Sequence, residues 1–376
     1  MLIRITNTPR PYAWGSPTAI AQLLGRAPSG GPEAELWLGS HPGSPARIVA
    51  GGDEEDLAQW AAAHAPEGRL PFLLKVLAAS APLSLQAHPT LEQAREGFAR
   101  ENALGIAVDA PERNYRDPYP KPELMLALSD PFRALCGFRP VAEARADLAS
   151  LSDPRLAPLL DRLVDDAELS SVVAWLLERS DGVDEVVGAL SEHASGVDGD
   201  ARGVWLGSVG MLAAHYPGDP GIAISTLLHT VLLRAGEALY LPAGNIHAYL
   251  EGLGIELMAA SDNVLRGGLT SKHIDVPELL RVLDARPMPA PYLEPEHPQP
   301  GLSIYRPGGV GFALVDATLT TGDERIVPTE RVAVALCLDG TIELDGESLR
   351  RGESAVVTDS APLLSGEGRV VIATVV

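Results

Sequence analysis

The sequence predicts a mainly β protein interrupted by an α-helical insert, because two kinds of hydrophobic periodicity divide the chain. Residues 1–130 alternate short apolar runs with glycine and proline, a pattern typical of strands joined by loops. Residues 136–217 instead repeat their apolar positions at helical spacing, and strand character resumes afterwards. A length of 376 residues exceeds one ordinary domain, so we expect more than one hydrophobic core.

Amphipathic helices are expected both in the insert and in the first β region. Within the insert, apolar residues recur at i, i+3, i+4 and i+7, which is the stripe that a helix buries against a core. Polar turns separate these stripes, and the insert carries no catalytic pattern of its own. The expected helices cover residues 54–64, 91–102, 156–164, 169–177, 183–190 and 205–216.

Strands and a linker are expected in the last part of the chain. The segment LLHTVLLRAGEALYLPAG has strand character, and AYLEGLGIELMAAS has the pattern of a hairpin. The proline-rich residues 286–301 are expected to form a linker. Beyond it, short apolar runs with glycine turns predict a jelly roll, and the absence of histidine from these runs predicts that it holds no metal.

Composition excludes several classes of partner and location. A formal net charge of −21 repels phosphate backbones, so we expect no nucleic acid. No apolar run approaches the length of a membrane span, and the amino terminus lacks the pattern of a secretory signal. The two cysteines, Cys136 and Cys337, lie in apolar segments and imply neither a disulfide framework nor a thiolate metal site. We therefore expect a cytoplasmic protein without a membrane partner.

The segment GEALYLPAGNIH, residues 236–247, spaces glycine, proline, glycine and histidine as G-x5-P-x-G-x2-H. Gly236 opens a tight turn before a short buried strand, and Pro242 with Gly244 bends the chain at its end. This bend aims His247 inward, where a neutral imidazole is a common metal ligand. The alternative is a core histidine bonded to a backbone carbonyl. The spacing is similar to the second signature of a cupin jelly roll.

Two further segments carry donor atoms. In the strand-like SLQAHP, Gln86 and His88 project from the same face, and Lys121 shares a face with Glu123 in KPE. Gln86, His88, Glu123 and His247 would give two oxygen donors and two imidazoles, a set suited to zinc, with iron, manganese or cobalt as substitutes. Glutamine is an uncommon zinc ligand, so spacing alone favours a hydrogen-bonded strand residue for Gln86.

Together, SLQAHP, KPE, LPAGNIHAYLEG and DNVLRGGLTSKH resemble the type I mannose-6-phosphate isomerases, zinc-dependent enzymes that interconvert mannose 6-phosphate and fructose 6-phosphate. The likeness extends to PYAWGS, AELWLGSHP, ALCGFRP and the insert. It implies a catalytic cupin domain formed by residues 1–135 and 218–290, around a helical insert at 136–217. Residues 291–376 would form a second, metal-free domain similar to a jelly roll.

The resemblance also implies individual roles. One zinc ion per chain would be held by Gln86, His88, Glu123 and His247. Arg266 would be the essential active-site arginine. Other matching positions line the family's substrate pocket: Lys75, Ser84, Lys121, Tyr249, Glu256, Asp262 and Lys272.

Proton transfer is the least determined of these roles. An aldose–ketose isomerisation needs a base near carbon, a cation near the developing oxyanion and an anchor for the phosphate. We assign Lys121 as proton carrier, with Glu256 and Asp262 as rivals, and Ser84 and Lys272 to the phosphate or sugar hydroxyls. Many relatives have histidine just before the KPE lysine, where this chain has Pro120, so that histidine cannot carry the proton here.

The basic residues pose a separate question, because a phosphorylated substrate requires a positive pocket inside an acidic protein. Lys75, Lys121, Arg266 and Lys272 could supply it, although each taken alone is most simply a solvated surface charge. Two other function classes stay open: an iron(II) oxygenase that uses His88, Glu123 and His247, and a non-catalytic sugar-phosphate-binding protein. The oligomeric state is left open, and a monomer is compatible with the sequence.

Overall fold

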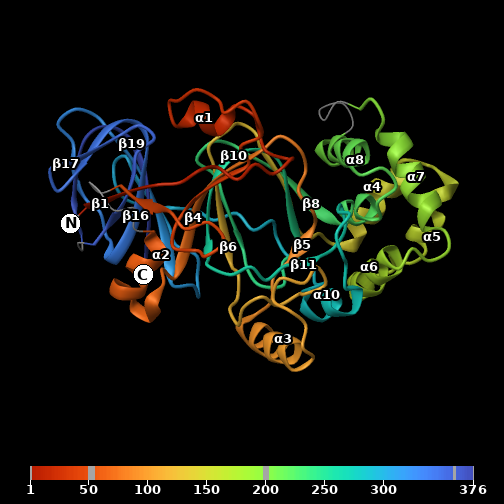
Figure 1. The fold of residues 1–376 in the computed structure, drawn as a ribbon. Helices are drawn as coiled ribbons and strands as arrows, with labels where there is room; N and C mark the ends of the chain where they lie inside the picture. Colours follow the sequence, from red (N-terminus) through yellow and green to blue (C-terminus); the bar gives the residue numbers. More distant parts are fainter. Residues whose placement is uncertain (1, 50–55, 198–202, 359–360, 376) are drawn as a thin grey trace.

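The computed structural model describes residues 2–49, 56–197, 203–358 and 361–375. Two antiparallel sheets and a group of helices follow one another along the molecule (Figure 1). The blue C-terminal strands lie at one end, the central sheet comes next, and the green and yellow helices lie at the other end. The expected mainly β architecture with a helical insert is confirmed.

The central sheet holds the residues singled out by the sequence. Its main path has the order β11-β5-β10-β4-β2, and β6 and β7 also pair with β10. Strand β9 pairs with β6, and β8 pairs with β7. Its strands are β2 (Glu35–Leu38), β4 (Phe72–Ala79), β5 (Gln86–Ala87), β6 (Glu123–Ala127), β7 (Phe132–Phe138), β8 (Leu228–Leu233), β9 (Ala238–Leu241), β10 (His247–Ala259) and β11 (Leu265–Arg266).

Strand β10 is one bent strand, so the expected hairpin in AYLEGLGIELMAAS is wrong. Its first part pairs with β5 and β7, and its second part pairs with β4 and β6. The register shifts between Tyr249 and Glu251, and Gly252 adopts a φ of 127°. A Cβ at Gly252 would lie 2.6 Å from the ring of Phe132. Gly252 therefore bends a continuous strand at the place where a hairpin turn was expected.

The second sheet combines the two ends of the chain. Strand β1 pairs with β18 and with β3, so residues from the amino terminus complete the C-terminal sheet. The strands are β1 (Leu2–Thr6), β3 (Arg47–Ile48), β12 (Glu296–Gln299), β13 (Leu302–Tyr305), β14 (Phe312–Leu319), β15 (Glu324–Ile326), β16 (Glu330–Leu344), β17 (Glu347–Arg350), β18 (Ser354–Val357) and β19 (Leu363–Val375).

The expected linker at 286–301 is wrong for part of its length, because β12 lies within it. This strand pairs with β13 and forms an edge of the sheet. Proline has no backbone N–H to donate, and an edge strand tolerates Pro298 because one of its sides needs no partner. Proline content therefore marked an edge strand as well as a connection.

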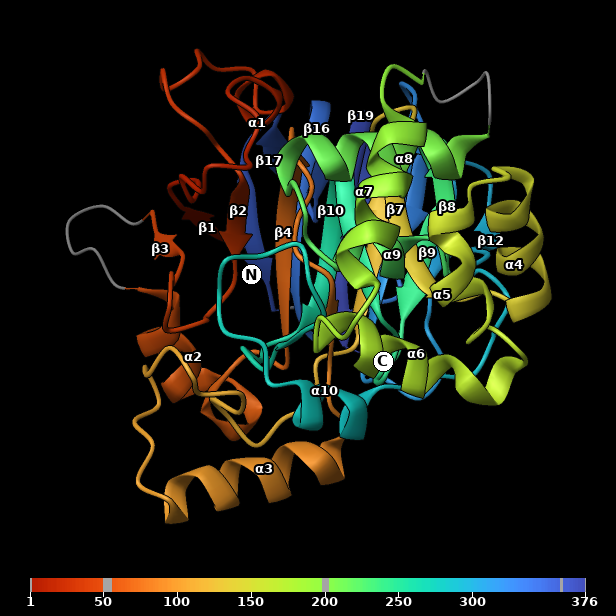
Figure 2. The same cartoon turned by 90° about the vertical axis from the view of Figure 1, so that its right-hand side faces the viewer.

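The helices of the insert pack around a shared apolar core that reaches the central sheet through Leu85 and Leu135. Figure 2 shows them in front of the sheet when that side of the molecule faces the viewer. The helices of the insert region are α4 (Val141–Ser150), α5 (Ala157–Leu160), α6 (Leu169–Leu177), α7 (Val183–Ala194), α8 (Val204–His215) and α9 (Gly221–Ser225). Outside the insert lie α1 (Ala19–Leu23), α2 (Leu57–His64), α3 (Leu91–Ala103) and α10 (Val276–Val282). Short 3-10 turns cover Pro66–Gly68, Pro154–Leu156 and Asp166–Glu168.

Most expected helices are present with small shifts of their ends. The expected helix at 54–64 begins at Leu57 in the structure, with Asp56 as its cap, and residues 54–55 lie outside the described residues. The expected helix at 156–164 is wrong in its second half, because α5 ends at Leu160 and Val164 is 73% exposed. Helix α4 was not anticipated, since its buried stripe is short and consists of Val141, Ala144 and Leu148.

The domain boundaries stay predictions. Strand β7 runs to Phe138, and the helices extend from Val141 to Ser225. No helix in the described part of the chain has both the length and the apolar character to cross a membrane.

The bend in β10 predicts a large stability effect at Gly252. Gly252→Ala should lower the free energy of unfolding by about 2–5 kcal/mol, because an alanine meets both an unfavourable φ and the Phe132 ring. Gly188→Ala in α7 is the matched control, since open space surrounds it and it should be neutral or slightly stabilising. Urea unfolding of both variants measures the difference, and equal effects would contradict the bend.

Candidate active site

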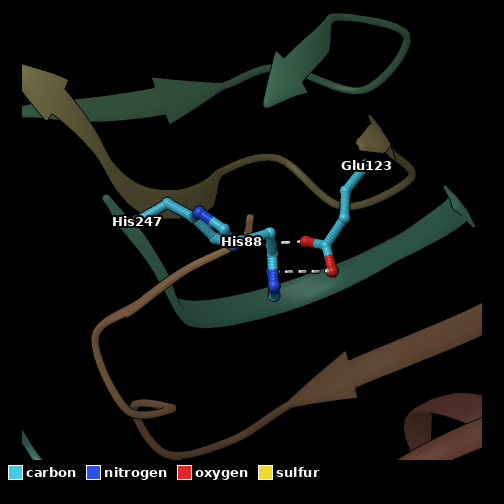
Figure 3. Close-up of side chains that lie close together, drawn as sticks. All are labelled: His88, Glu123 and His247. Carbon is cyan, nitrogen blue, oxygen red and sulfur yellow. Dashed lines mark ion pairs between the residues drawn. The ribbon is translucent and has the colours of Figure 1, made fainter. Parts of the chain in front are cut away.

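Three buried side chains meet inside the central sheet. His88 follows β5, Glu123 opens β6 and His247 opens β10. His88 Nε2 lies 3.3 Å from Glu123 Oε1, and His247 Nε2 lies 3.2 Å from Glu123 Oε2. Figure 3 shows both imidazole rings facing this one carboxylate. The donor atoms of the three residues lie within 4.8 Å of one another, a spacing that a single metal ion can bridge.

The hydrogen bonds of the two rings determine which nitrogen is free. His88 Nδ1 donates to the carbonyl of Asn263 at 2.7 Å, and His247 Nδ1 donates to the carbonyl of Asn245 at 3.0 Å. A carbonyl can only accept, so in the neutral rings each Nε2 carries a lone pair. Burial lowers the pKa of His88 to about 4, which keeps that ring neutral.

These lone pairs face a carboxylate, and two acceptors pointed at a third repel one another. His88 Nε2 is buried without a hydrogen-bond donor, and Glu123 Oε1 has only the ammonium of Lys121 at 2.8 Å. A cation between the three groups satisfies all of them, and the pattern of Nδ1–H bonded to carbonyls is the usual outer support of a histidine that binds metal. The residues therefore fit a metal site.

Gln86 lies beside this cluster. It stands opposite His247 in the pairing of β5 with β10, and its amide nitrogen is 3.3 Å from His247 Nε2. Amide oxygen and nitrogen exchange places by a half-turn of the side chain, which would present the oxygen to the same point. The structure therefore brings all four expected ligands together.

Lys121 and Tyr249 support the Glu123 carboxylate. Lys121 Nζ lies 2.8 Å from Glu123 Oε1, and the Tyr249 hydroxyl donates to Oε2 at 3.3 Å. Burial alone would raise the pKa of Glu123, whereas the positive charge of Lys121 lowers it and favours the ionised carboxylate. Burial raises the pKa of Tyr249 well above its usual value, so this hydroxyl keeps its proton.

Lys75 and Glu256 form a separate buried ion pair between β4 and β10. Lys75 Nζ is 2.8 Å from Glu256 Oε2 and 3.7 Å from Glu35 Oε1, and the Trp37 indole donates to Glu35 at 2.8 Å. Burial would lower the pKa of Lys75, but the two carboxylates outweigh it and raise that pKa. Burial raises the pKa of Glu256, and the positive charge of Lys75 offsets this rise only in part. Lys75 is thus not the solvated surface charge that it would be when taken alone.

Next to the metal cluster, two adjoining cavities share Arg266, Ser271 and Lys272 in their walls. One, of about 510 Å³, also contains Ser84 and Gln86, and the other, of about 620 Å³, contains Arg116 and Asp262. Arg266 Nη1 donates to Ser84 Oγ at 3.0 Å, which holds the guanidinium at the junction.

Arg116, Arg266 and Lys272 therefore line one hollow, together with Arg113, which is already paired with Glu101. Burial lowers the pKa of Arg266 and the charge of Arg116 adds to this effect, while the charge of Arg266 is the largest cause of the lowered pKa of Lys272. Like charges held this close repel one another, and an anion placed among them relieves that repulsion.

Asp262 is the carboxylate whose surroundings favour ionisation at this cavity. His41 Nε2 lies 3.3 Å from Asp262 Oδ2, and His41 Nδ1 accepts from the amide of Gly43, so Nε2 carries the ring proton. Burial would raise the pKa of Asp262, but the hydrogen bond from His41 together with the charges of Lys121 and Arg116 outweighs burial and lowers the pKa. The side chain of Asp262 stays 44% exposed.

Sequence reasoning missed Arg116 and His41 as functional candidates. His41 stands in AELWLGSHP, and Arg116 lies five residues before Lys121. Neither belongs to a spaced motif with Gln86, Glu123 or His247, so only their position in the segments around the motifs could have drawn attention to them.

A carboxylate and two imidazoles buried between the strands of a jelly roll define a cupin-type metal site. Residues 2–141 match the family described as phosphomannose isomerase type I, catalytic domain. The mannose-6-phosphate isomerase of Escherichia coli (strain K12) is 38% identical over 98% of both chains, and the one from Homo sapiens is 31% identical over 88% of this chain and 86% of its own. The chain belongs to the type I phosphomannose isomerase family.

Solved structures agree with this assignment. A zinc-bound mannose 6-phosphate isomerase has a TM-score of 0.89 at 35% identity, over 100% of this chain and 99% of its own. A second structure of mannose 6-phosphate isomerase, bound with zinc and yttrium, has a TM-score of 0.88 at 35% identity and the same coverage. The expected fold class and the resemblance stated from the motifs are both confirmed.

The buried ion pair predicts a contrast between two lysines. Lys75→Met should lower the free energy of unfolding by about 3–5 kcal/mol, because it leaves Glu35 and Glu256 buried without their counter-charge. The exposed Lys272→Met should change stability by no more than about 0.5 kcal/mol. Denaturant unfolding at neutral pH measures both, and an unaffected Lys75→Met would contradict the ion-pair assignment.

Proposed function

We propose that this chain interconverts mannose 6-phosphate and fructose 6-phosphate, with one zinc ion held by Gln86, His88, Glu123 and His247. The observation that carries the proposal is the convergence of two imidazole lone pairs on one buried carboxylate, beside a cavity whose wall includes Arg116, Arg266 and Lys272. A relative that covers 98% of this chain is a mannose-6-phosphate isomerase, and a zinc-bound structure of a mannose 6-phosphate isomerase shares its fold. A coupled assay from fructose 6-phosphate, with and without a chelator, tests substrate, reaction and metal together.

An iron(II) oxygenase is not favoured. His88, Glu123 and His247 could hold ferrous iron, but an uncharged substrate would leave the cations of the cavity without a partner. A phosphorylated sugar supplies the anion that these cations require. A binding protein without activity would also not need the isomerase-like set of proton-transfer candidates that this chain retains.

The chemistry divides between the metal and the chain. When bound, the zinc ion supplies Lewis-acid polarisation of a substrate oxygen. Arg266, tethered by Ser84, lies where a guanidinium can stabilise negative charge that develops as a proton moves between C1 and C2. Lys272 lies in both adjoining cavities and is suited to anchoring the phosphate.

For the proton carrier, we propose Lys121 or Asp262. Lys121 lies next to the ligand carboxylate, and Asp262 lines the cavity as an ionised group. Glu256, the third candidate, is paired with the buried Lys75, which weakens its case. Pro120 cannot carry a proton, so the carrier is not at the position where many relatives have histidine. We keep Lys75 and Tyr249 as residues that shape the substrate pocket through Glu256 and Glu123.

A cytoplasmic location is part of this proposal. Cys136 and Cys337 are both free and buried, which suits a reducing compartment. The net charge of −21 argues against a nucleic-acid partner and is compatible with a small-molecule substrate.

Removal of the metal should abolish turnover, and zinc should restore it. His247→Ala should lose bound zinc, because it removes one of two imidazole donors. His215→Ala, at the exposed end of α8, serves as control and should keep one zinc per chain. Metal analysis after dialysis reads out both variants, and full turnover by metal-stripped protein would remove the proposal.

Arg266 and Lys272 should differ in kinetics. Arg266→Ala should lower kcat by about two orders of magnitude or more, as expected when a preorganised charge acts mainly on the transition state. Lys272→Ala should raise KM more than it lowers kcat, because an anchor holds ground state and transition state alike. Arg286→Ala, an exposed arginine paired with Asp284, is the control. An Arg266→Ala variant altered only in KM would reassign Arg266 to substrate anchoring.

A further inference from the structure

Asn263 is a fully buried residue in the loop between β10 and β11. Its side-chain nitrogen donates to the carbonyls of Asp117 and Tyr119, each at 2.8 Å. Its side-chain oxygen accepts from the backbone amides of Arg116 at 2.7 Å and Asp117 at 3.3 Å. Carbonyls only accept and amides only donate, so the orientation of this carboxamide follows from its partners. All of these hydrogen bonds join the Asn263 side chain to one segment, residues 116–119.

The main chain of the same residue supports the metal cluster. The Asn263 carbonyl accepts the Nδ1 proton of His88 at 2.7 Å, and this bond leaves His88 Nε2 as the free donor. Arg266, the proposed catalytic arginine, follows three residues later. Asn263 therefore joins three parts of the site: the ring of His88, the segment that carries Arg116, and the strand that carries Arg266.

Other bonds of this loop run through the same segment. The amide of Asp262 donates to Asp117 Oδ2 at 2.8 Å, and Ser261 Oγ donates to Asp117 Oδ1 at 2.8 Å. By contrast, the side chain of Asn245, whose carbonyl supports His247, bonds only to the sulfur of Met288. The His247 carbonyl partner lies in the tight turn of the motif, whereas the His88 carbonyl partner depends on a side chain that crosses to another segment.

We propose that Asn263 is a positioning residue that orients His88 for metal binding by locking the 261–263 loop onto residues 116–119. The inference rests on the proposed function, because it takes His88 to be a metal ligand. Losing the carboxamide would leave the Arg116 amide and the Asp117 and Tyr119 carbonyls without their buried partner. The loop would then shift, and the carbonyl that orients the imidazole would shift with it.

Metal affinity, measured on the full chain by competition with a chelator, tests this inference. Asn263→Ala should bind zinc about 10- to 100-fold more weakly than the wild type, the loss typical of removing an outer support of a ligand. Cobalt(II) substituted for zinc should show a changed visible spectrum in the same variant, because the donor geometry changes. A role in stability alone would move neither readout.

Asn7→Ala is the matched control. Asn7 is another asparagine whose side chain ties two segments together, through the carbonyls of Trp37 and Ser44, and it lies outside the metal cluster. It should lose stability yet keep wild-type metal affinity and the wild-type cobalt spectrum. If Asn263→Ala does not fold, Asp117→Asn replaces it as the test variant. This change weakens the bonds that Asp117 accepts from the Asp262 amide and the Asn263 side chain, and it should lower zinc affinity about threefold or more.

The outcomes separate this inference from the function on which it rests. A wild-type chain that binds no zinc overturns the proposed function, and the role of Asn263 with it. A wild-type chain that binds zinc, together with an Asn263→Ala or Asp117→Asn variant of equal affinity and unchanged cobalt spectrum, overturns the positioning role alone.

Discussion

The Glu123 carboxylate is the group on which the site depends. It is fully buried, and a buried charge is costly unless other charges and hydrogen bonds compensate for it. Lys121 and the Tyr249 hydroxyl compensate for it, and two histidines face it, His88 beside β5 and His247 in the same strand as Tyr249. Because these groups converge on one carboxylate, the strands that carry them must meet at its position.

The bent strand β10 makes that meeting possible. Its first residue, His247, stands beside Gln86 of β5, while its second part pairs with β6, the strand that Glu123 opens. One continuous strand therefore spans both sides of the site. Gly252 permits the change of direction, since a side chain there would collide with Phe132. The helical insert covers the side of this sheet from which Leu85 and Ala248 point into a shared apolar core.

The proposed affinity for an anion rests on the charges of one cavity. The chain carries a net charge of −21, yet Arg116, Arg266 and Lys272 line one cavity. A local cluster of one sign in a low-dielectric wall attracts its counter-ion, even when the rest of the surface has the opposite sign. Buried lysines elsewhere in the site are already neutralised by carboxylates, so the cavity cations are the ones left for substrate.

The sequence by itself determined the mainly β class, most helices, the four ligand candidates and the family, because these depend on local periodicity and on motifs of closely spaced residues. Only the tertiary structure decided that β10 is one strand, that β1 completes the C-terminal sheet and that residues 296–299 form an edge strand. It also decided the partners of Arg116, His41 and Asn263. These features depend on contacts between residues far apart in the chain, and a pattern read along one segment carries no information about which distant carbonyl or carboxylate will face it.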